Sequence, residues 1–167
     1  REQGKVRFIG FTGHKSPHIH LKMLGQDFAW DALQMPLNIM DATYRSFAEQ
    51  VIPIANARGI AVIGMKSIGG GPGYITQSGL VTVAECLRYV LSLDIPVLVS
   101  GMASMSHLRE NIAVARGFKP LTDAERKELL GRVQQVAGDG RCEPFKSTQM
   151  FDSGVHRTQH GFPLQQG

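Results

Sequence analysis

Cysteine is scarce and long apolar runs are absent in this 167-residue sequence. Its two cysteines, Cys86 and Cys142, form neither a CxxC pair nor a set with metal-ligand spacing, so a disulfide-built fold is not expected and a reducing compartment fits best. No apolar run approaches the roughly 20 residues needed to span a bilayer, and the charged residues 1–5 do not resemble a signal peptide. We therefore expect a cytoplasmic protein with no membrane partner.

Runs of like charge and the standard phosphate-binding motifs are also missing. The 18 basic and 14 acidic residues give a net charge of +4 that is spread along the chain, so no nucleic-acid partner is expected. Neither Gly-x-Gly-x-x-Gly nor a P-loop occurs. His18 and His20 would point to different faces of a helix, and His156 and His160 have no third ligand nearby, so no metal site is predicted.

The sequence does contain a fourfold alternation of strand and helix patterns. Short apolar runs predict strands at residues 6–11, 32–35, 60–63 and 95–99. Caps, helical spacing and stop signals predict helices at residues 17–24, 44–58, 83–92, 106–116 and 123–136. From Gly138 the composition turns polar, which predicts an extended or partly ordered C-terminal extension at residues 138–167.

Alternating units of this kind form a parallel sheet. The pattern suits either a doubly wound sheet or part of a (β/α)8 barrel; because a whole barrel needs about 250 residues, four units amount to half of one. In both architectures function collects in the loops after the carboxyl ends of the strands. These loops are expected at residues 12–15, 36–40, 65–73 and 100–105.

The third of these loops is rich in glycine. Gly69, Gly70, Gly71 and Gly73 lack side chains and permit positive φ, so their backbone N–H groups could converge on a phosphate, with Lys66 just before them. A plain surface turn explains the same glycines. Considered alone, the loop leaves both interpretations open.

Four segments of the chain carry a more specific pattern. They are GKVRFIGFT at residues 4–12, ALQMPLN at 32–38, RGIAVIGMKSIGGG at 58–71 and SGMASMSHLREN at 100–111. In this order and spacing they resemble the second half of an aldo/keto reductase. The resemblance implies an α/β fold in which residues 1–137 form four βα units, the second half of a (β/α)8 TIM barrel, followed by the extension at 138–167. It also implies a nicotinamide cofactor, NADP or else NAD, and no metal.

The resemblance assigns cofactor roles to residues of these segments. Thr12, Gly13 and Gln34 stand where the family holds the nicotinamide carboxamide, and Met65 stands where an aromatic residue usually stacks on the nicotinamide ring. The residues expected beside the pyrophosphate are Lys66, Ser67, Gly69, Gly70 and Gly71. Those that match the segment around the adenosine end are Gly101, Met102, Ala103, His107, Glu110 and Asn111.

The catalytic residues of the family have no counterpart in this chain. Its tyrosine general acid and the accompanying lysine, aspartate and histidine belong to the first half of the barrel, so no catalytic residue is predicted and the 167-residue segment is expected to be inactive alone. Tyr44 and Tyr89 are interpreted as packing residues. The complete enzyme would reduce aldehydes or ketones with NAD(P)H.

Two other functions and several partners stay open. A non-catalytic nucleotide-binding or regulatory subunit would also lack the catalytic residues, and a phosphate-binding barrel of unrelated chemistry is a third alternative. Half a barrel exposes two sheet edges and one apolar face, so we expect a missing N-terminal half or self-association, besides a small-molecule carbonyl substrate. The extension could fold over the barrel mouth through Phe145, Phe151 and Phe162, or lack order.

Overall fold

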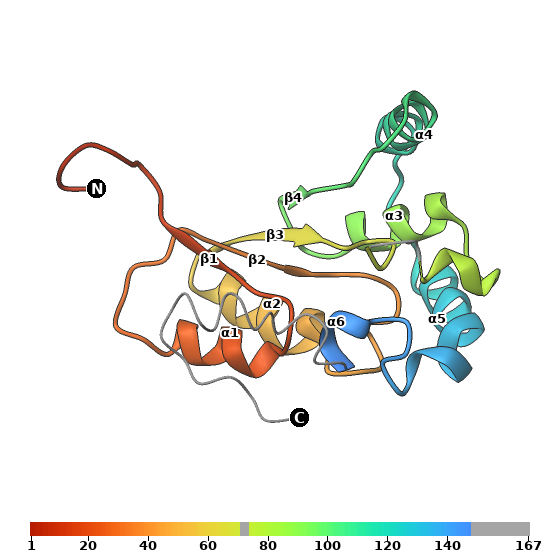
Figure 1. Cartoon of the computed structure of the whole chain (residues 1–167), viewed down its shortest axis with the longest axis horizontal. Coiled ribbons are helices and arrows are strands. Elements are labelled where there is room, and N and C mark those ends of the chain that lie inside the picture. Colours follow the sequence, from red (N-terminus) through yellow and green to blue (C-terminus); the bar gives the residue numbers. More distant parts are fainter. Residues whose placement is uncertain (71–73, 148–167) are drawn as a thin grey trace.

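One parallel sheet organises the chain, in a computed structural model that describes residues 1–70 and 74–147. Its strands lie side by side in the order β1-β2-β3-β4 (Figure 1). They span Gly10–Thr12 (β1), Ala32–Pro36 (β2), Ala61–Met65 (β3) and Val97–Leu98 (β4). A doubly wound sheet reverses its strand order at a switch point, so this sequential order favours half of a (β/α)8 barrel.

Each strand is followed by a helix whose start agrees with a capping signal in the sequence. Thr82 and Thr122 both form the predicted capping boxes, each accepting from the backbone of a glutamate three residues later. Within residues 1–70 and 74–147, no helix combines the length and apolarity needed to cross a membrane. The helices are α1 (Pro17–Leu24), α2 (Phe47–Ala57), α3 (Val83–Leu91), α4 (Met105–Arg116), α5 (Asp123–Ala137) and the short α6 (Pro144–Ser147), with a 3-10 turn η1 (Thr76–Ser78).

The first strand is shorter than predicted because only its end has a neighbour to pair with. Pairing begins where the Asp31 backbone N–H donates to the Ile9 carbonyl at 2.9 Å and the Asp31 carboxylate accepts from the Ile9 N–H at 2.7 Å. Residues 1–8 precede this point and are exposed. The last strand is shortened to two residues after Pro96, which has no N–H to donate to a ladder.

The second helix also begins later than predicted. Arg45 has a φ of +44°, which interrupts a right-handed helix, so Tyr44 lies in the loop and the helix starts after the cap residue Ser46. Tyr89 does lie on a helix and is buried, in agreement with its interpretation as a packing residue.

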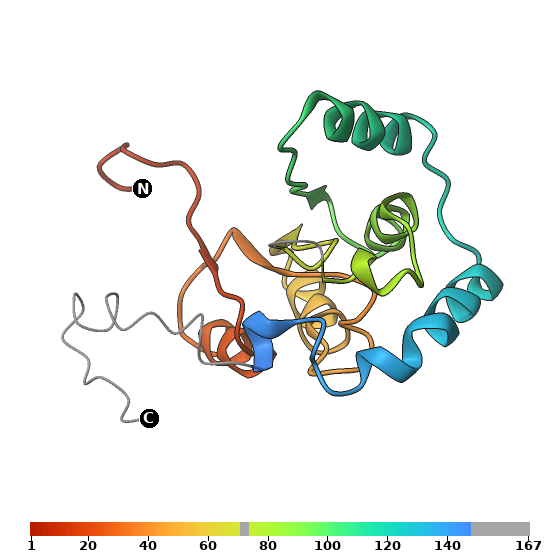
Figure 2. The ribbon, with the colours of Figure 1, turned by 45° about the vertical axis from the view of Figure 1, so that its right-hand side comes forward.

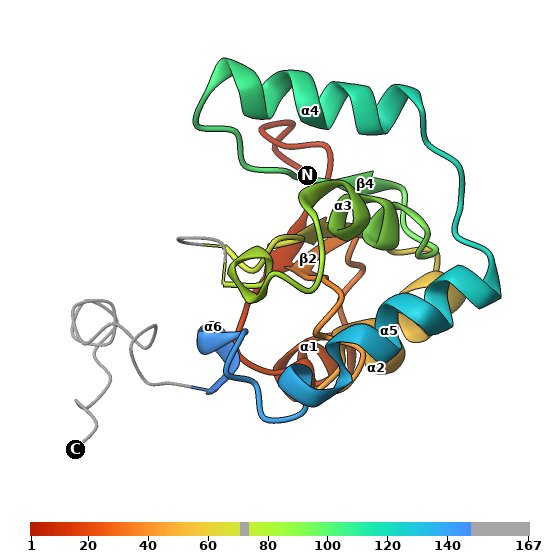
Figure 3. The same cartoon turned by 90° about the vertical axis from the view of Figure 1, so that its right-hand side faces the viewer.

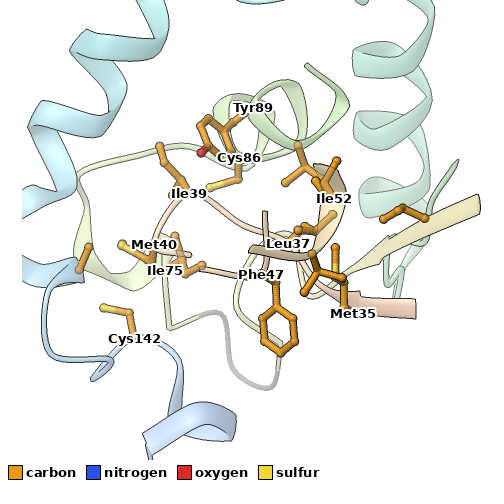
Figure 4. Close-up of a cluster of buried hydrophobic side chains, with 14 of the residues drawn as sticks. Met35, Leu37, Ile39, Met40, Phe47, Ile52, Ile75, Cys86, Tyr89 and Cys142 are labelled. Atoms are coloured by element: carbon orange, nitrogen blue, oxygen red, sulfur yellow. The ribbon is translucent and has the colours of Figure 1, made fainter. Parts of the chain in front are cut away.

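The two faces of the sheet differ in exposure. Side chains alternate along each strand, and those on one face pack on α1 and α2, which lie together beneath the sheet in Figure 1. Figure 4 shows this core continuing from Met35 and Phe47 to Cys86 and Tyr89 of α3. On the opposite face, Thr12, Ala61 and Val97 are exposed. The apolar run at residues 60–63 is therefore not buried on both faces, because Ala61 is exposed.

A buried lysine ties the C-terminal segment to the loop after β2. The side chain of Lys146 has no exposed surface, and its ammonium has three acceptors: Asp41 Oδ1 at 2.6 Å, Glu143 Oε2 at 2.9 Å and the Tyr44 carbonyl at 2.9 Å. Three donors and three acceptors match, which is the condition under which a buried charge is tolerated. The Asn38 amide donates to the other oxygen of Glu143 at 2.8 Å.

The same cluster sets the start of α2. Asp41 accepts from the backbone N–H groups of Phe47 and Ala48, both at 2.9 Å, so a carboxylate lies at the positive end of the helix dipole. Burial is the largest influence on Glu143 and raises the pKa of its carboxyl, while Lys146 opposes that rise.

The beginning of the polar extension is therefore ordered rather than extended. Glu143, Phe145 and Lys146 are buried, and α6 lies at the carboxyl end of the sheet, beside the loops after β1 and β2 (Figures 2 and 3). Composition alone misses this because Lys146 and Glu143, besides pairing with each other, each need a partner 105 residues earlier in the chain. Residues 148–167, with Phe151, Phe162, His156 and His160, lie outside the described residues.

We predict that Lys146→Met destabilises the fold by about 3–5 kcal/mol, the usual cost of leaving buried charges without their partner. Unfolding midpoints in urea would measure the loss. Lys127→Met is the matched control, because Lys127 is exposed on α5 and should change the midpoint little. Equal midpoints for the two variants would contradict the prediction.

Candidate functional site

A pocket of about 480 Å³ lies beyond the carboxyl ends of β3 and β4. The loops that follow these two strands provide its walls, as expected for the functional end of parallel βα units. The described residues that line it are Met65, Lys66, Ser67, Ile68, Gly70, Val99, Gly101, Met102, Ala103 and His107. The structure thus brings together most of the residues that the sequence assigned to the pyrophosphate and adenosine end of a cofactor.

The lysine of this pocket lies against the glycine loop. A Cβ at Gly70 would come within 2.6 Å of Lys66 Cδ and 2.9 Å of Lys66 Nζ, and Gly70 has a φ of +68°. Lys66 itself has a φ of +58°, a conformation that costs energy for a residue with a side chain. Absence of a side chain at Gly70 therefore lets the ammonium lie over the loop backbone.

The described part of this loop is packed against the core. Ser67 is buried, the Gly69 N–H donates to the Lys66 carbonyl at 2.8 Å, and a Cβ at Gly69 would come within 2.9 Å of Ile75 Cγ1. Gly71 and Gly73 lie outside the described residues. Where it is described, the loop is a tight, packed turn with a cation on it.

The start of α4 forms the other wall of the pocket. Its cap residue Ser104 accepts from the His107 N–H at 3.2 Å, and the His107 ring accepts from the Ala103 N–H at 3.4 Å. Glu110 and Asn111 do not line this pocket among the described residues; Asn111 instead donates to Ser100 Oγ at 3.0 Å. The pocket lining therefore includes four of the six adenosine-end candidates.

The three residues expected at the carboxamide lie at the ends of β1 and β2. Thr12 pairs with Gln34 in the parallel register, and the Gly13 N–H donates to the Gln34 carbonyl at 3.3 Å. Strand β3 connects these three residues to the pocket. Pro36 on β2 pairs with Met65 on β3, and the Leu37 N–H donates to the Met65 carbonyl at 2.8 Å. Both groups therefore lie at one end of the sheet.

Sequence reasoning missed His20, which lies beneath this group. Its side chain is only 1% exposed, and its Nε2 bonds to the Gln34 carbonyl at 3.1 Å. A Cβ at Gly13 would come within 3.1 Å of His20 Cε1. Gly13 was the signal in the sequence, because a glycine leaves space for a larger neighbouring side chain.

Two histidines at this end are held neutral. Burial is the main cause that lowers the pKa of His14, and the nearby charges of Lys66 and His20 lower it further. Burial also lowers the pKa of His20, although the carbonyls of Gln34 and Ser16 favour the charged ring. The His14 ring lies 6.4 Å from that of Phe145, so the α6 segment contacts the loop after β1.

Other chemistry-bearing residues have structural positions. Burial raises the pKa of Tyr89 to about 12 and that of the Cys86 thiol to about 12, which leaves both groups protonated. Tyr74 is partly exposed after the glycine loop and is not among the described residues that line the pocket. Residues 1–70 and 74–147 contain no group of three or more His, Cys, Asp or Glu side chains that could hold a metal.

No protein-family model matches the chain, and no curated protein sequence matches it either. Among solved structures, the chain is similar to the aldo-keto reductase AKR11C1 from Bacillus halodurans in its apo form, with a TM-score of 0.60 and 18% sequence identity. The similarity covers 78% of this chain and 52% of that chain. The chain thus spans about half the length of this reductase, and the predicted resemblance in fold, half of an aldo/keto reductase barrel, is confirmed.

The lowered histidine pKa values predict that stability falls with pH. Between the native pKa of His20 and its ordinary value of 6.5, the unfolded chain binds more protons than the native chain. The contribution of His20 to the free energy of unfolding should therefore be complete above pH 6.5 and should decrease as the pH falls below that value. His14 should add to this decrease, because its pKa is also lowered. Urea titrations between about pH 5.5 and 7.5 would measure this slope.

His20→Phe should make the slope shallower, because it removes the buried titrating ring while keeping an aromatic side chain. His18→Phe is the control, since His18 is exposed on the same helix. If His20→Phe retains the full pH dependence of the free energy of unfolding seen in the original protein, His20 is not the group responsible for it.

Proposed function

We propose that this chain is the cofactor-binding half of an NAD(P)H-dependent aldo/keto reductase, whose complete form reduces aldehydes or ketones. The observation that carries the proposal is the pocket beyond β3 and β4, where Lys66 lies over Gly70 at the end of a half barrel with the fold of such a reductase. Similarity of fold at 18% sequence identity does not by itself establish a function. The chemistry of the pocket adds the second argument.

The residues present fit a dinucleotide. Lys66 offers a cation to a pyrophosphate, the side-chain-free Gly70 allows close approach to the backbone, and the N-terminus of α4 offers unpaired N–H groups to a phosphate. Thr12 and Gln34 would hold the nicotinamide carboxamide, and Met65, which lies between the two groups of residues, would contact the ring. The cofactor, when bound, supplies the hydride for carbonyl reduction.

A non-catalytic nucleotide-binding or regulatory subunit is the second candidate. The observation that favours it is the lack of any residue in this chain that matches the family's tyrosine, lysine, aspartate and histidine. The encoding gene separates the two: about 150 further in-frame residues of strand-helix repeats carrying that tetrad would exclude the second candidate. A barrel that binds phosphate for unrelated chemistry is a third candidate, which would bind no nicotinamide cofactor.

We predict that NADPH binds the full chain and that Lys66→Met weakens this binding by roughly tenfold, the loss of one charge-assisted contact. Titration followed by cofactor fluorescence would measure both affinities, and NADH in the same titration would show which cofactor is preferred. Lys22→Met is the control, because Lys22 is exposed on α1, remote in sequence from the pocket loops. Lack of binding by the original protein would overturn the proposed function.

We also propose that a complementary half barrel, from an N-terminal segment or a second copy, covers the exposed face of the sheet. The edge strands β1 and β4 each have only one partner strand in the described structure, and Val97 on the open face is 47% exposed. Unpaired parallel edges and an open apolar face favour association.

The 167-residue chain alone should therefore self-associate in sedimentation velocity experiments, and Val97→Lys should reduce that association. Ile19→Lys is the matched control: Ile19 is 49% exposed, nearly the same fraction, but it lies on α1. A stable, well-folded monomer of the original protein would contradict the prediction.

A further inference from the structure

His20 joins the two strands that carry the expected carboxamide site. It lies on α1, yet its Nε2 bonds at 3.1 Å to the Gln34 carbonyl on β2, the same oxygen that accepts from the Gly13 N–H after β1. A carbonyl oxygen can only accept, so Nε2 carries the proton and the neutral ring leaves Nδ1 as an acceptor. One carbonyl thus holds both the end of the β1–β2 ladder and the imidazole.

Packing holds the ring in this position from three sides. The ring centroid lies 5.2 Å from that of Phe11 on β1 and 5.1 Å from that of Phe47 on α2. The third side is Gly13, where even a methyl group would approach His20 Cε1 to 3.1 Å. Glycine at this position and a buried histidine beneath it therefore depend on each other.

A planar amide can be held by two strands only if their side chains keep a fixed separation. Thr12 and Gln34 are register partners, so both project from the same face of the sheet. The His20 bond lies immediately past Thr12, where the backbone ladder between β1 and β2 ends. Rigid support of this kind is what a binding site needs to hold its geometry.

We propose that His20 is a positioning residue for the nicotinamide end of the cofactor site: its bond to the Gln34 carbonyl fixes the spacing of Thr12 and Gln34. This inference rests on the proposed function. His20 does not touch the cofactor, since its side chain is almost fully buried.

The lowered pKa of His20 agrees with this role, because the neutral ring keeps a defined tautomer near pH 7. Among the described residues, no group gives Nδ1 a hydrogen bond. The bond to the Gln34 carbonyl is therefore the hydrogen bond that orients the ring, and the Ser16 carbonyl is a second backbone group that acts on it.

The test compares two ligands on the full chain. NADPH carries the nicotinamide, whereas 2′-phospho-ADP-ribose keeps the phosphates and adenosine but lacks it. His20→Phe keeps an aromatic ring and removes the bond to Gln34, so it should weaken NADPH binding roughly 3- to 10-fold, the range for one hydrogen bond. Binding of 2′-phospho-ADP-ribose, measured by calorimetry, should stay unchanged.

Two further variants complete the design. His20→Gln retains a donor nitrogen at a similar distance from the backbone and should restore much of the NADPH affinity, while His18→Phe should bind both ligands like the original protein. Equal NADPH affinity for His20→Phe and the original protein would overturn the positioning role and leave the proposed function intact. Equal weakening of both ligands would also overturn it, because general destabilisation would then be the cause. Failure of the original protein to bind either ligand would overturn both proposals.

Discussion

The requirement to neutralise a buried ammonium determines how the C-terminal segment meets the loop after β2. Lys146 has no exposed surface, and its acceptors Asp41 and Tyr44 lie more than 100 residues earlier in the chain. Asp41 also caps α2, so the helix start, the loop after β2 and the C-terminal segment depend on one carboxylate. A network of this kind is stable only when complete, since each missing partner leaves a buried polar group unsatisfied.

Local signals explain why much of the fold could be predicted from the sequence. Ser16 followed by Pro17, and the capping boxes at Thr82 and Thr122, act within one turn of chain, and the helices begin where these residues place them. Strand ends could not be predicted in the same way. The length of β1 depends on the strand that faces it, and the ordering of the segment with α6 depends on Asp41, so tertiary partners decide both.

The candidate site, like the fold, could be predicted from the sequence only in part. Parallel βα units place loops at one sheet end, which explains why residues as distant in sequence as Lys66 and His107 line the same pocket. His20 was not predicted, because a histidine on a short helix gives no sign of the carbonyl it will meet. Gly13 is the sequence feature that relates to it, because a side chain at position 13 would contact the His20 ring. That relation can be recognised only once the structure shows that His20 lies next to Gly13.

Among the described residues that line the pocket, the permanent charge resides in one side chain, that of Lys66. Burial and neighbouring charges lower the pKa of His14, and burial lowers that of His20, so neither ring adds a positive charge near pH 7. The Lys66 ammonium lies over Gly70, where no side chain covers the backbone. A cation above a side-chain-free backbone gives an anion such as a phosphate room to approach, which supports the cofactor role that we propose for this pocket.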